Sequence, residues 1–150
     1  KRISEFFNFL SRIPFMTKQP PKSTGRELFN HELIAPYLSK YNKYPENILR
    51  TLTDFTSWSI AENIRLYAEP KSIIIASGGG TENIFLLEQL KKELGGTKIL
   101  MSDNFVIPTD AKEAICFAYL AYRTLGGMTS NLPSVTGASH EAKLGVIAFP

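Results

Sequence analysis

The sequence contains a single cysteine and has no long basic or apolar runs. Cys116 alone cannot form an intramolecular disulfide, and no asparagine is followed two places later by serine or threonine. The lack of basic clusters interleaved with aromatic residues argues against nucleic-acid binding. The apolar runs are too short to span a membrane. We therefore expect a cytoplasmic protein without nucleic-acid or membrane partners.

The sequence also lacks the GxGxxG and P-loop patterns of common nucleotide-binding sites, and it lacks residues spaced as metal ligands. The GxGxxG pattern fails because position 83 is not glycine, and Lys22–Thr24 resembles the end of a P-loop without the required preceding glycine. His31 and His140 have no cysteine or histidine at ligand spacing. We expect no metal site built by this chain alone.

The composition is that of an ordinary globular domain. Of the 150 residues, 43% are hydrophobic and 21% are charged, which is enough apolar material for one core. The 17 basic and 14 acidic residues leave a net charge of +3, which would not repel a phosphate ligand. The N-terminus carries no initiator methionine, and we expect the sequence to be cut from a longer chain.

The first half shows helical periodicity. On its long helix we expect Phe55 and Trp58 in the core, and Asp54 and Glu62 in a solvated stripe. We expect residues 1–16 to form a short amphipathic helix followed by an irregular segment broken at Pro14. Further helices are expected from Arg26 to about Leu38, with Pro36 as a point of interruption, and from Pro45 to just before Pro70.

The second half begins with the pattern of a βαβ unit. Ser72–Ala76 is a β-branched run, Ser77–Gly80 is a glycine turn, Thr81–Leu94 has apolar residues at helical spacing, and Lys98–Met101 supplies a second strand. This order favours two parallel strands with a right-handed crossover.

A further helix, Asp110–Leu125, is apolar nearly all round, so we expect it to be deeply buried. Cys116 would then be a buried, inert thiol, and Phe117 and Tyr119 would belong to the core. Gly145–Phe149 is expected to form a last strand.

The three consecutive glycines after the first strand suggest a ligand site. Gly78, Gly79 and Gly80 let a ligand approach the backbone closely, and the free N–H groups of a helix starting at Thr81 favour a phosphate or a polar nucleotide group. The alternative is a tight turn without a ligand, which would need fewer glycines.

Three segments together resemble the C-terminal half of the anhydro-N-acetylmuramic acid kinase family, and the likeness covers nearly the whole chain. They are Pro20–Asn30 (PPKSTGRELFN), Ser77–Asn83 (SGGGTEN), and a third that runs from Thr109–Ala114 (TDAKEA) through Leu120–Thr124 (LAYRT) to Asn131–Ala138 (NLPSVTGA).

The resemblance implies an α/β fold, the C-terminal lobe of an actin-like ATPase (ribonuclease H-like) with a short mixed sheet and covering helices. It implies a kinase that uses ATP and Mg²⁺ to convert 1,6-anhydro-N-acetylmuramic acid to N-acetylmuramic acid 6-phosphate in peptidoglycan recycling. It also implies that Gly78, Gly79, Gly80 and Asn83 contact the nucleotide and that Glu113 contacts the sugar. Local pattern offers another role for Glu113, a capping box with Asp110.

The same resemblance implies that the catalytic base lies in an N-terminal lobe absent from this chain, so we expect no catalytic residue here and no turnover by this part alone. The alternative is a non-catalytic nucleotide-binding or dimerisation module derived from the kinase. The expected partners are ATP, the anhydro amino sugar, the missing lobe and a second copy in a homodimer.

Overall fold

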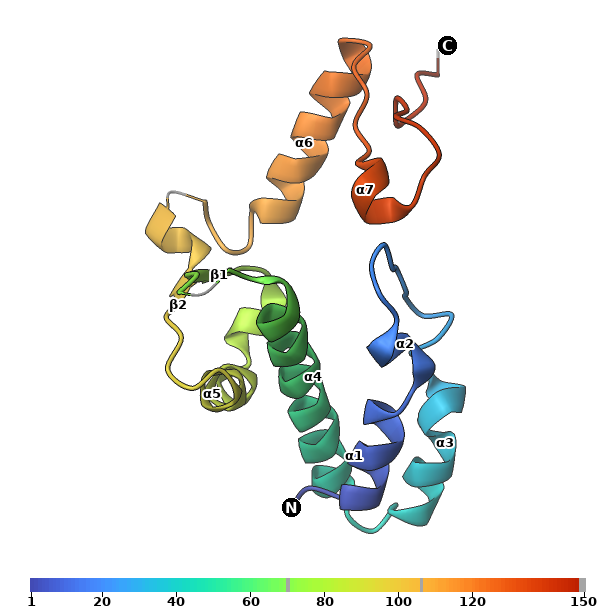
Figure 1. The fold of residues 1–150 in the computed structure, drawn as a ribbon, viewed down its shortest axis with the longest axis vertical. Coiled ribbons are helices and arrows are strands. Elements are labelled where there is room, and N and C mark those ends of the chain that lie inside the picture. The colour runs from blue at the N-terminus through green and yellow to red at the C-terminus, as the bar shows by residue number, and fades with distance from the viewer. Residues whose placement is uncertain (70, 106, 149–150) are drawn as a thin grey trace.

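The computed structural model describes residues 1–69, 71–105 and 107–148 of the chain. A helical first part is followed by an α/β unit, a long helix and an irregular tail (Figure 1). The elements are α1 (Ser4–Ser11), α2 (Pro14–Thr17), α3 (His31–Lys40), α4 (Pro45–Tyr67), β1 (Ile74–Ala76), the 3₁₀ helix η1 (Gly79–Glu82), α5 (Ile84–Glu93), β2 (Ile99–Met101), the 3₁₀ helix η2 (Ser102–Phe105), α6 (Lys112–Leu125) and α7 (Pro133–Thr136).

The helical part has a small aromatic and aliphatic core between α1, α3 and α4. Phe6 and Leu10 lie one turn apart on α1 and are almost fully buried against α4, while the Phe6 ring stacks on Tyr37 at 4.4 Å between centroids. Burial of each such side chain contributes roughly 1.5–3 kcal/mol. Phe55 is buried and Trp58 packs against the same cluster, which confirms their predicted place in the core.

The start of α3 differs from the sequence prediction. The helix begins at His31 rather than Arg26, because the side-chain oxygen of Asn30 accepts a hydrogen bond from the Leu33 N–H at 2.9 Å. The preceding residues instead form a turn closed by the Gly25 carbonyl. Pro36 lies inside α3 without interrupting it, and Pro14 begins the short helix α2 where an irregular segment was expected.

An exposed cluster joins α1 to the end of α3. The Glu5 carboxylate accepts hydrogen bonds from the Lys40 ammonium at 2.6 Å and the Tyr41 hydroxyl at 2.9 Å. The hydrogen bond from Lys40, and then that from Tyr41, hold the pKa of Glu5 below its ordinary value of 4.5.

This pKa shift predicts acid sensitivity. A depressed carboxylate pKa stabilises the fold above the unfolded value, and that contribution is lost as pH falls below about 4.5 through the lower folded value. Melting temperature measured from pH 7 to pH 2.5 should therefore fall less steeply on the acid side in Glu5→Gln. Glu46→Gln, which removes an exposed carboxylate from the first turn of α4, is the matched control. Equal acid slopes in both variants and the wild type would contradict the role of Glu5.

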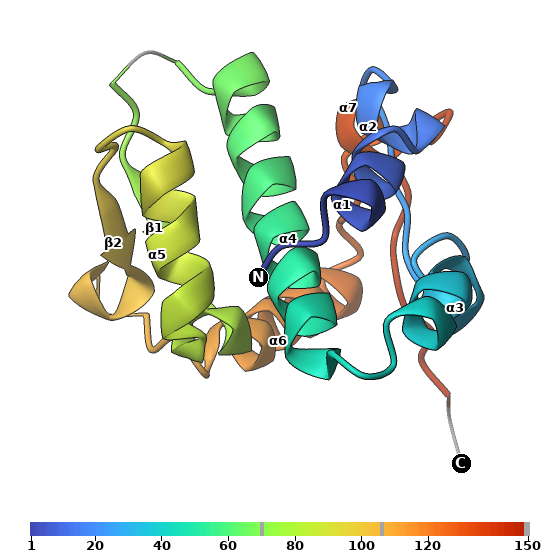
Figure 2. The same ribbon diagram turned by 90° about the horizontal axis from the view of Figure 1, so that it is seen from below.

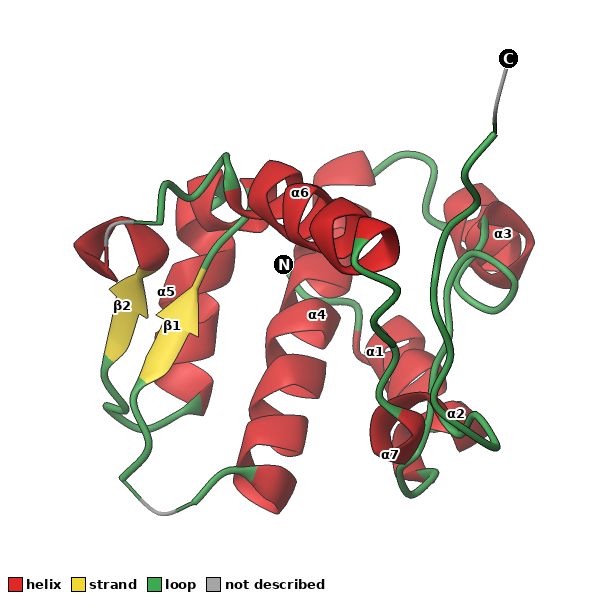
Figure 3. Cartoon of the chain, turned by 90° about the horizontal axis from the view of Figure 1, so that it is seen from above, coloured by secondary structure: helices red, strands yellow, loops and turns green. Residues whose placement is uncertain are grey.

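The α/β unit confirms the predicted βαβ order. β1 and β2 are parallel, with Ile74 opposite Ile99 and Ala76 opposite Met101, and α5 makes the crossover. In the described residues the sheet has these two parallel strands, so the expected mixed sheet is not formed. The carboxyl ends of both strands lie at one edge of the unit, beside η2 and the loop to α6 (Figure 3).

Helix α5 packs along α4 and runs in the same direction (Figure 2). Near the start of α4, Arg50 approaches Gln89, and near its end Arg65 contacts Glu93. These contacts hold the middle and the C-terminal end of α5 against α4.

Helix α6 contradicts the prediction of deep burial. It stands apart from the helical part (Figure 1), and it has no buried residue. Cys116 is exposed, Phe117 is 71% exposed and Tyr119 is 55% exposed. A helix that is apolar on most sides should be covered, but the described part of this chain supplies no cover.

The expected strand at the C-terminus is not observed. Residues 145–148 are irregular, and Phe149 lies outside the described residues. Within the described ranges, no helix combines the length and hydropathy of a membrane span.

Candidate functional site

The glycine turn follows the carboxyl end of β1 and is open. Gly78 has φ 89° and ψ 171°, a conformation that is essentially restricted to glycine. A Cβ atom built on Gly78, Gly79 or Gly80 would meet no heavy atom within 4 Å. We call residues Gly78–Glu82 the glycine corner, and its backbone is accessible rather than covered by side chains.

The helix after the corner starts later than the sequence predicts. Residues Gly79–Glu82 form η1, because Thr81 donates both its N–H (3.0 Å) and its hydroxyl (2.7 Å) to the Gly78 carbonyl. Helix α5 therefore begins at Ile84 and not at Thr81. Asn83 is its N-cap, with the side-chain oxygen accepting from the Leu86 N–H at 3.0 Å. The cap engages the oxygen of Asn83, and no described residue is hydrogen-bonded to its amide NH₂ group.

The backbone N–H groups of the three glycines differ in whether they have a hydrogen-bond acceptor. The Gly78 N–H donates to the Thr109 carbonyl at 3.1 Å. Among the described residues, no acceptor is paired with the N–H groups of Gly79 and Gly80. Two successive unpaired N–H groups on an accessible turn are suited to binding an anion.

The loop after β2 is joined to the corner by Thr109. The Asp103 carboxylate accepts hydrogen bonds from the Thr109 N–H at 3.2 Å and from the Thr109 hydroxyl. The buried Ser102 hydroxyl lies 3.2 Å from the same Thr109 oxygen. The hydrogen bond from the Thr109 hydroxyl, and to a smaller extent that from the Thr109 N–H, lowers the pKa of Asp103. The sequence analysis did not find this contact, although an Asp-Asn pair one residue after the end of a strand is a recognisable turn signal.

The predicted capping box at the start of α6 is wrong. The N-cap is Ala111, in a helical conformation and without a side-chain cap bond. The Ala111 N–H instead donates to the Pro108 carbonyl at 3.1 Å, so the turn that begins at Pro108 displaces Asp110 from the cap position. Glu113 is exposed in the first turn of α6, four residues after Thr109, and its carboxylate is free of the predicted cap.

The structure brings the three segments of the family pattern together in pairs. The second meets the start of the third through the hydrogen bond between Gly78 and Thr109. The first meets the end of the third beside α7 (Figure 1), where a Cβ on Gly137 would lie 3.6 Å from Cγ of Pro21. Glu113 and the glycine corner therefore flank the same loop, whereas Pro20–Asn30 lies on the helical side.

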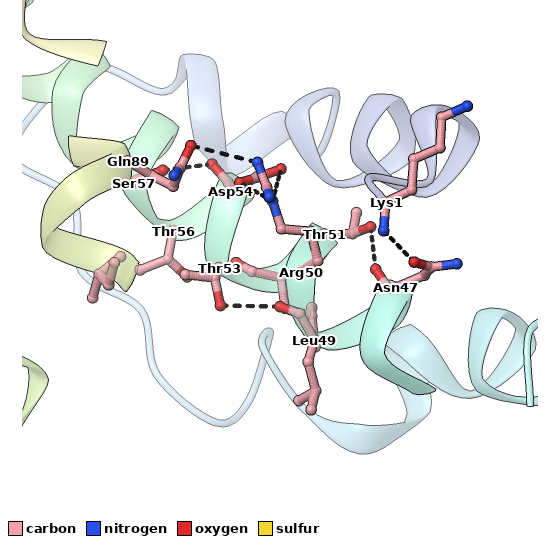
Figure 4. Close-up of polar contacts among 12 residues, drawn as sticks. Lys1, Asn47, Leu49, Arg50, Thr51, Thr53, Asp54, Thr56, Ser57 and Gln89 are labelled. Atoms are coloured by element: carbon pink, nitrogen blue, oxygen red, sulfur yellow. Dashed lines mark hydrogen bonds and ion pairs between the residues drawn. The ribbon is translucent and has the colours of Figure 1, made fainter. Parts of the chain in front are cut away.

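The sequence analysis missed an ion pair within α4, between Arg50 and Asp54 (Figure 4). The Arg50 Nε atom donates to both carboxylate oxygens of Asp54, at 2.9 and 3.0 Å. The guanidinium also lies 4.5 Å from the centroid of the Phe85 ring on α5. Asp54 is 7% exposed, so it does not belong to a solvated stripe with Glu62 as predicted. Its spacing of four residues from Arg50 was a signal for an ion pair.

Other parts of the surface are less suited to this chemistry. An apolar pocket of about 420 Å³ lies between the helices of the first part and shares no lining residue with the glycine corner. In the described part of the chain, no three His, Cys, Asp or Glu side chains are grouped as metal ligands, so no residue here is assigned to Mg²⁺.

Comparison with known proteins gives one consistent family. The family model described as "Anhydro-N-acetylmuramic acid kinase" matches residues 3–150. A protein of that name from Actinobacillus pleuropneumoniae serotype 7 (strain AP76) is 38% identical over 149 residues, which are 98% of this chain and 40% of the relative. Namesakes from Vibrio vulnificus (strain CMCP6) and Acaryochloris marina (strain MBIC 11017) are 39% and 41% identical, over 93% and 89% of this chain and 38% and 36% of the relatives. The chain thus spans about 40% of the length of these curated relatives.

Proposed function

This chain belongs to the anhydro-N-acetylmuramic acid kinase family, and on that basis we propose that it is the C-terminal, nucleotide-binding part of such a kinase. The whole protein would transfer the γ-phosphate of ATP to 1,6-anhydro-N-acetylmuramic acid, with opening of the anhydro ring by water, to give N-acetylmuramic acid 6-phosphate. The observation that carries the proposal is the match of residues 3–150 to the family. No feature of the described structure favours the non-catalytic alternative.

We assign nucleotide binding to the glycine corner. The unpaired N–H groups of Gly79 and Gly80 would donate to phosphate oxygens, and the lack of side chains lets the nucleotide lie against the backbone. The free amide NH₂ group of Asn83 would add a side-chain donor beside the corner. Arg50 supports this site indirectly, because its guanidinium, paired with Asp54 on α4, contacts Phe85 and Gln89 of α5.

We assign sugar binding to Glu113. Its carboxylate is exposed, makes no cap bond, and follows the loop that is tied to Gly78. A carboxylate in this place can accept hydrogen bonds from sugar hydroxyls while the nucleotide lies on the glycine corner.

Exposed apolar residues on the sheet and on α6 support the view that this part of the protein packs against further polypeptide. A two-stranded sheet is marginal by itself, and Ile73, just before β1, and Ile75, within β1, are 57% and 53% exposed. Helix α6 likewise has an apolar surface that is exposed to solvent. We propose that the remaining 60% or so of a relative's length, judged from the 40% matched, supplies further strands, cover for α6, the second lobe of an actin-like fold and the catalytic base.

The proposed activity is tested by assaying the protein that carries this sequence with ATP and the anhydro sugar, and by identifying the 6-phosphate product by mass spectrometry. In Glu113→Gln, loss of a charged acceptor should raise KM for the sugar about tenfold and leave KM for ATP within twofold. Asp110→Asn, a neighbouring exposed acid outside the proposed contacts, is the control. An unchanged sugar KM in Glu113→Gln would remove Glu113 from the site, and absence of product in the wild type would contradict the proposed function.

A further inference from the structure

Gly78, like Gly79 and Gly80, is only weakly constrained by its own chemistry, since glycine has the widest range of backbone angles. Its orientation is fixed from outside, by the hydrogen bond from its N–H to the Thr109 carbonyl at 3.1 Å. Gly78 in turn accepts both hydrogen bonds from Thr81, which set the 3₁₀ turn. The position of the unpaired N–H groups of Gly79 and Gly80 therefore depends on where the Thr109 carbonyl is held.

Asp103 holds Thr109 in place through the N–H and hydroxyl groups of that residue. One carboxylate accepts hydrogen bonds from the N–H and from the hydroxyl of Thr109, which together restrict the φ and χ1 angles of that residue. Ser102 is 4% exposed, and its hydroxyl lies against the hydroxyl oxygen of Thr109. With Thr109 fixed at both groups, its carbonyl stays directed to Gly78.

We propose that Asp103 is a positioning residue for the nucleotide, acting through Thr109 to hold the glycine corner in its binding conformation. The proposal rests on the proposed function of the corner. Asp103 itself need not touch the nucleotide. Its lowered pKa agrees with a carboxylate that stays ionised at neutral pH and keeps both acceptor contacts.

Removal of the negative charge of Asp103 distinguishes a positioning role from a direct electrostatic effect on the nucleotide, because the two predict opposite changes in affinity. A carboxylate near a polyphosphate repels it, so removal of the Asp103 charge alone would strengthen nucleotide binding. Loss of the hydrogen bonds to Thr109 would instead weaken binding, because the corner would sample conformations that do not bind. Thr109→Val removes the hydroxyl without any change of charge and should act in the same direction as Asp103→Ala.

The test compares four variants of the protein that carries this sequence. We expect Kd for ATP to rise about tenfold in Asp103→Ala and about threefold in Thr109→Val, and to return to the wild-type value in Thr109→Ser, which restores the hydroxyl. Glu88→Ala, which removes an exposed carboxylate from α5, is the charge control and should not weaken binding. KM for the sugar should stay close to wild type, because neither Asp103 nor Thr109 is among the proposed sugar contacts.

A second readout needs no nucleotide. Amide hydrogen exchange at Gly78, measured by NMR, should speed up in Asp103→Ala and Thr109→Val and stay slow in Thr109→Ser. Unchanged exchange at Gly78, or ATP binding that is unchanged or tighter in Asp103→Ala, would overturn the proposal. Failure of the wild type to bind ATP, with faster Gly78 exchange in the two variants, would instead contradict the proposed function of the corner and leave the coupling of Asp103 to Gly78 intact.

Discussion

Alanine at position 79 or 80 is expected to lower nucleotide affinity by ten- to a hundredfold and to leave the melting temperature unchanged. Neither residue has a left-handed φ, and the added Cβ would meet no protein atom within 4 Å, so the free protein tolerates the methyl group. The same methyl group would occupy the space in which a phosphate approaches the unpaired N–H groups. Loss of one hydrogen bond to a charged group costs roughly 1.5–3 kcal/mol, which corresponds to about a ten- to hundredfold change in affinity.

Position 78 is expected to behave differently from its neighbours. Gly78→Ala should reduce both stability and affinity, because φ 89° with ψ 171° costs any other residue about 1–3 kcal/mol. Gly96→Ala is the matched control for strain, since Gly96 has φ 94° and an equally open Cβ position in the turn before β2, away from the corner. It should lower the melting temperature without changing ATP affinity.

Isothermal calorimetry with ATP and thermal unfolding of the four variants separate these effects. If both single variants, Gly79→Ala and Gly80→Ala, bound ATP with wild-type affinity, the nucleotide could not lie closely against this backbone. The triple glycine would then serve only as a tight turn.

Loss of Arg50 should be among the most destabilising changes at the surface of α4. Arg50→Ala leaves the carboxylate of Asp54, which is 7% exposed, without its partner and removes the contact with Phe85. Breaking a buried pair costs 3–5 kcal/mol, and the 39% exposure of the Arg50 side chain reduces this to about 2 kcal/mol. Urea unfolding gives the change in free energy directly.

Two comparisons show whether the cost arises from the unpaired charge. The double variant Arg50→Met with Asp54→Leu should recover most of the lost stability, because it removes both charges and keeps the apolar volume. Arg65→Ala breaks exposed ion pairs with Glu62 and Glu93 on the same two helices and should cost less than about 1 kcal/mol. Equal costs for Arg50→Ala and Arg65→Ala would contradict the special role of Arg50.

The βαβ unit and its glycine turn could be predicted because they depend on local chemistry. A β-branched run, three glycines and a leucine-spaced helix leave few alternatives, and the structure has the parallel strands that this order favours. The core positions of Phe55 and Trp58 followed from helical periodicity in the same way.

Other features depended on contacts that one segment does not encode. The apolar pattern of α6 gave its tendency to be covered but not the identity of the cover, so Phe117 and Cys116 were wrongly placed in the core. The starts of α3 and α5 were misplaced because Asn30 and Asn83 compete as caps with residues a few positions earlier. The contact of Asp103 with Thr109 joins residues across a loop, and local patterns of helix and strand do not predict it.

The most direct measurement is an NMR titration of the ¹⁵N-labelled protein with a non-hydrolysable ATP analogue, followed at the amides of Gly79 and Gly80. Large, saturable shifts at these two amides, with small shifts in the turn at Gly95 and Gly96, are the predicted result. Saturation of nucleotide binding without any movement of the Gly79 and Gly80 signals would show that the nucleotide lies elsewhere.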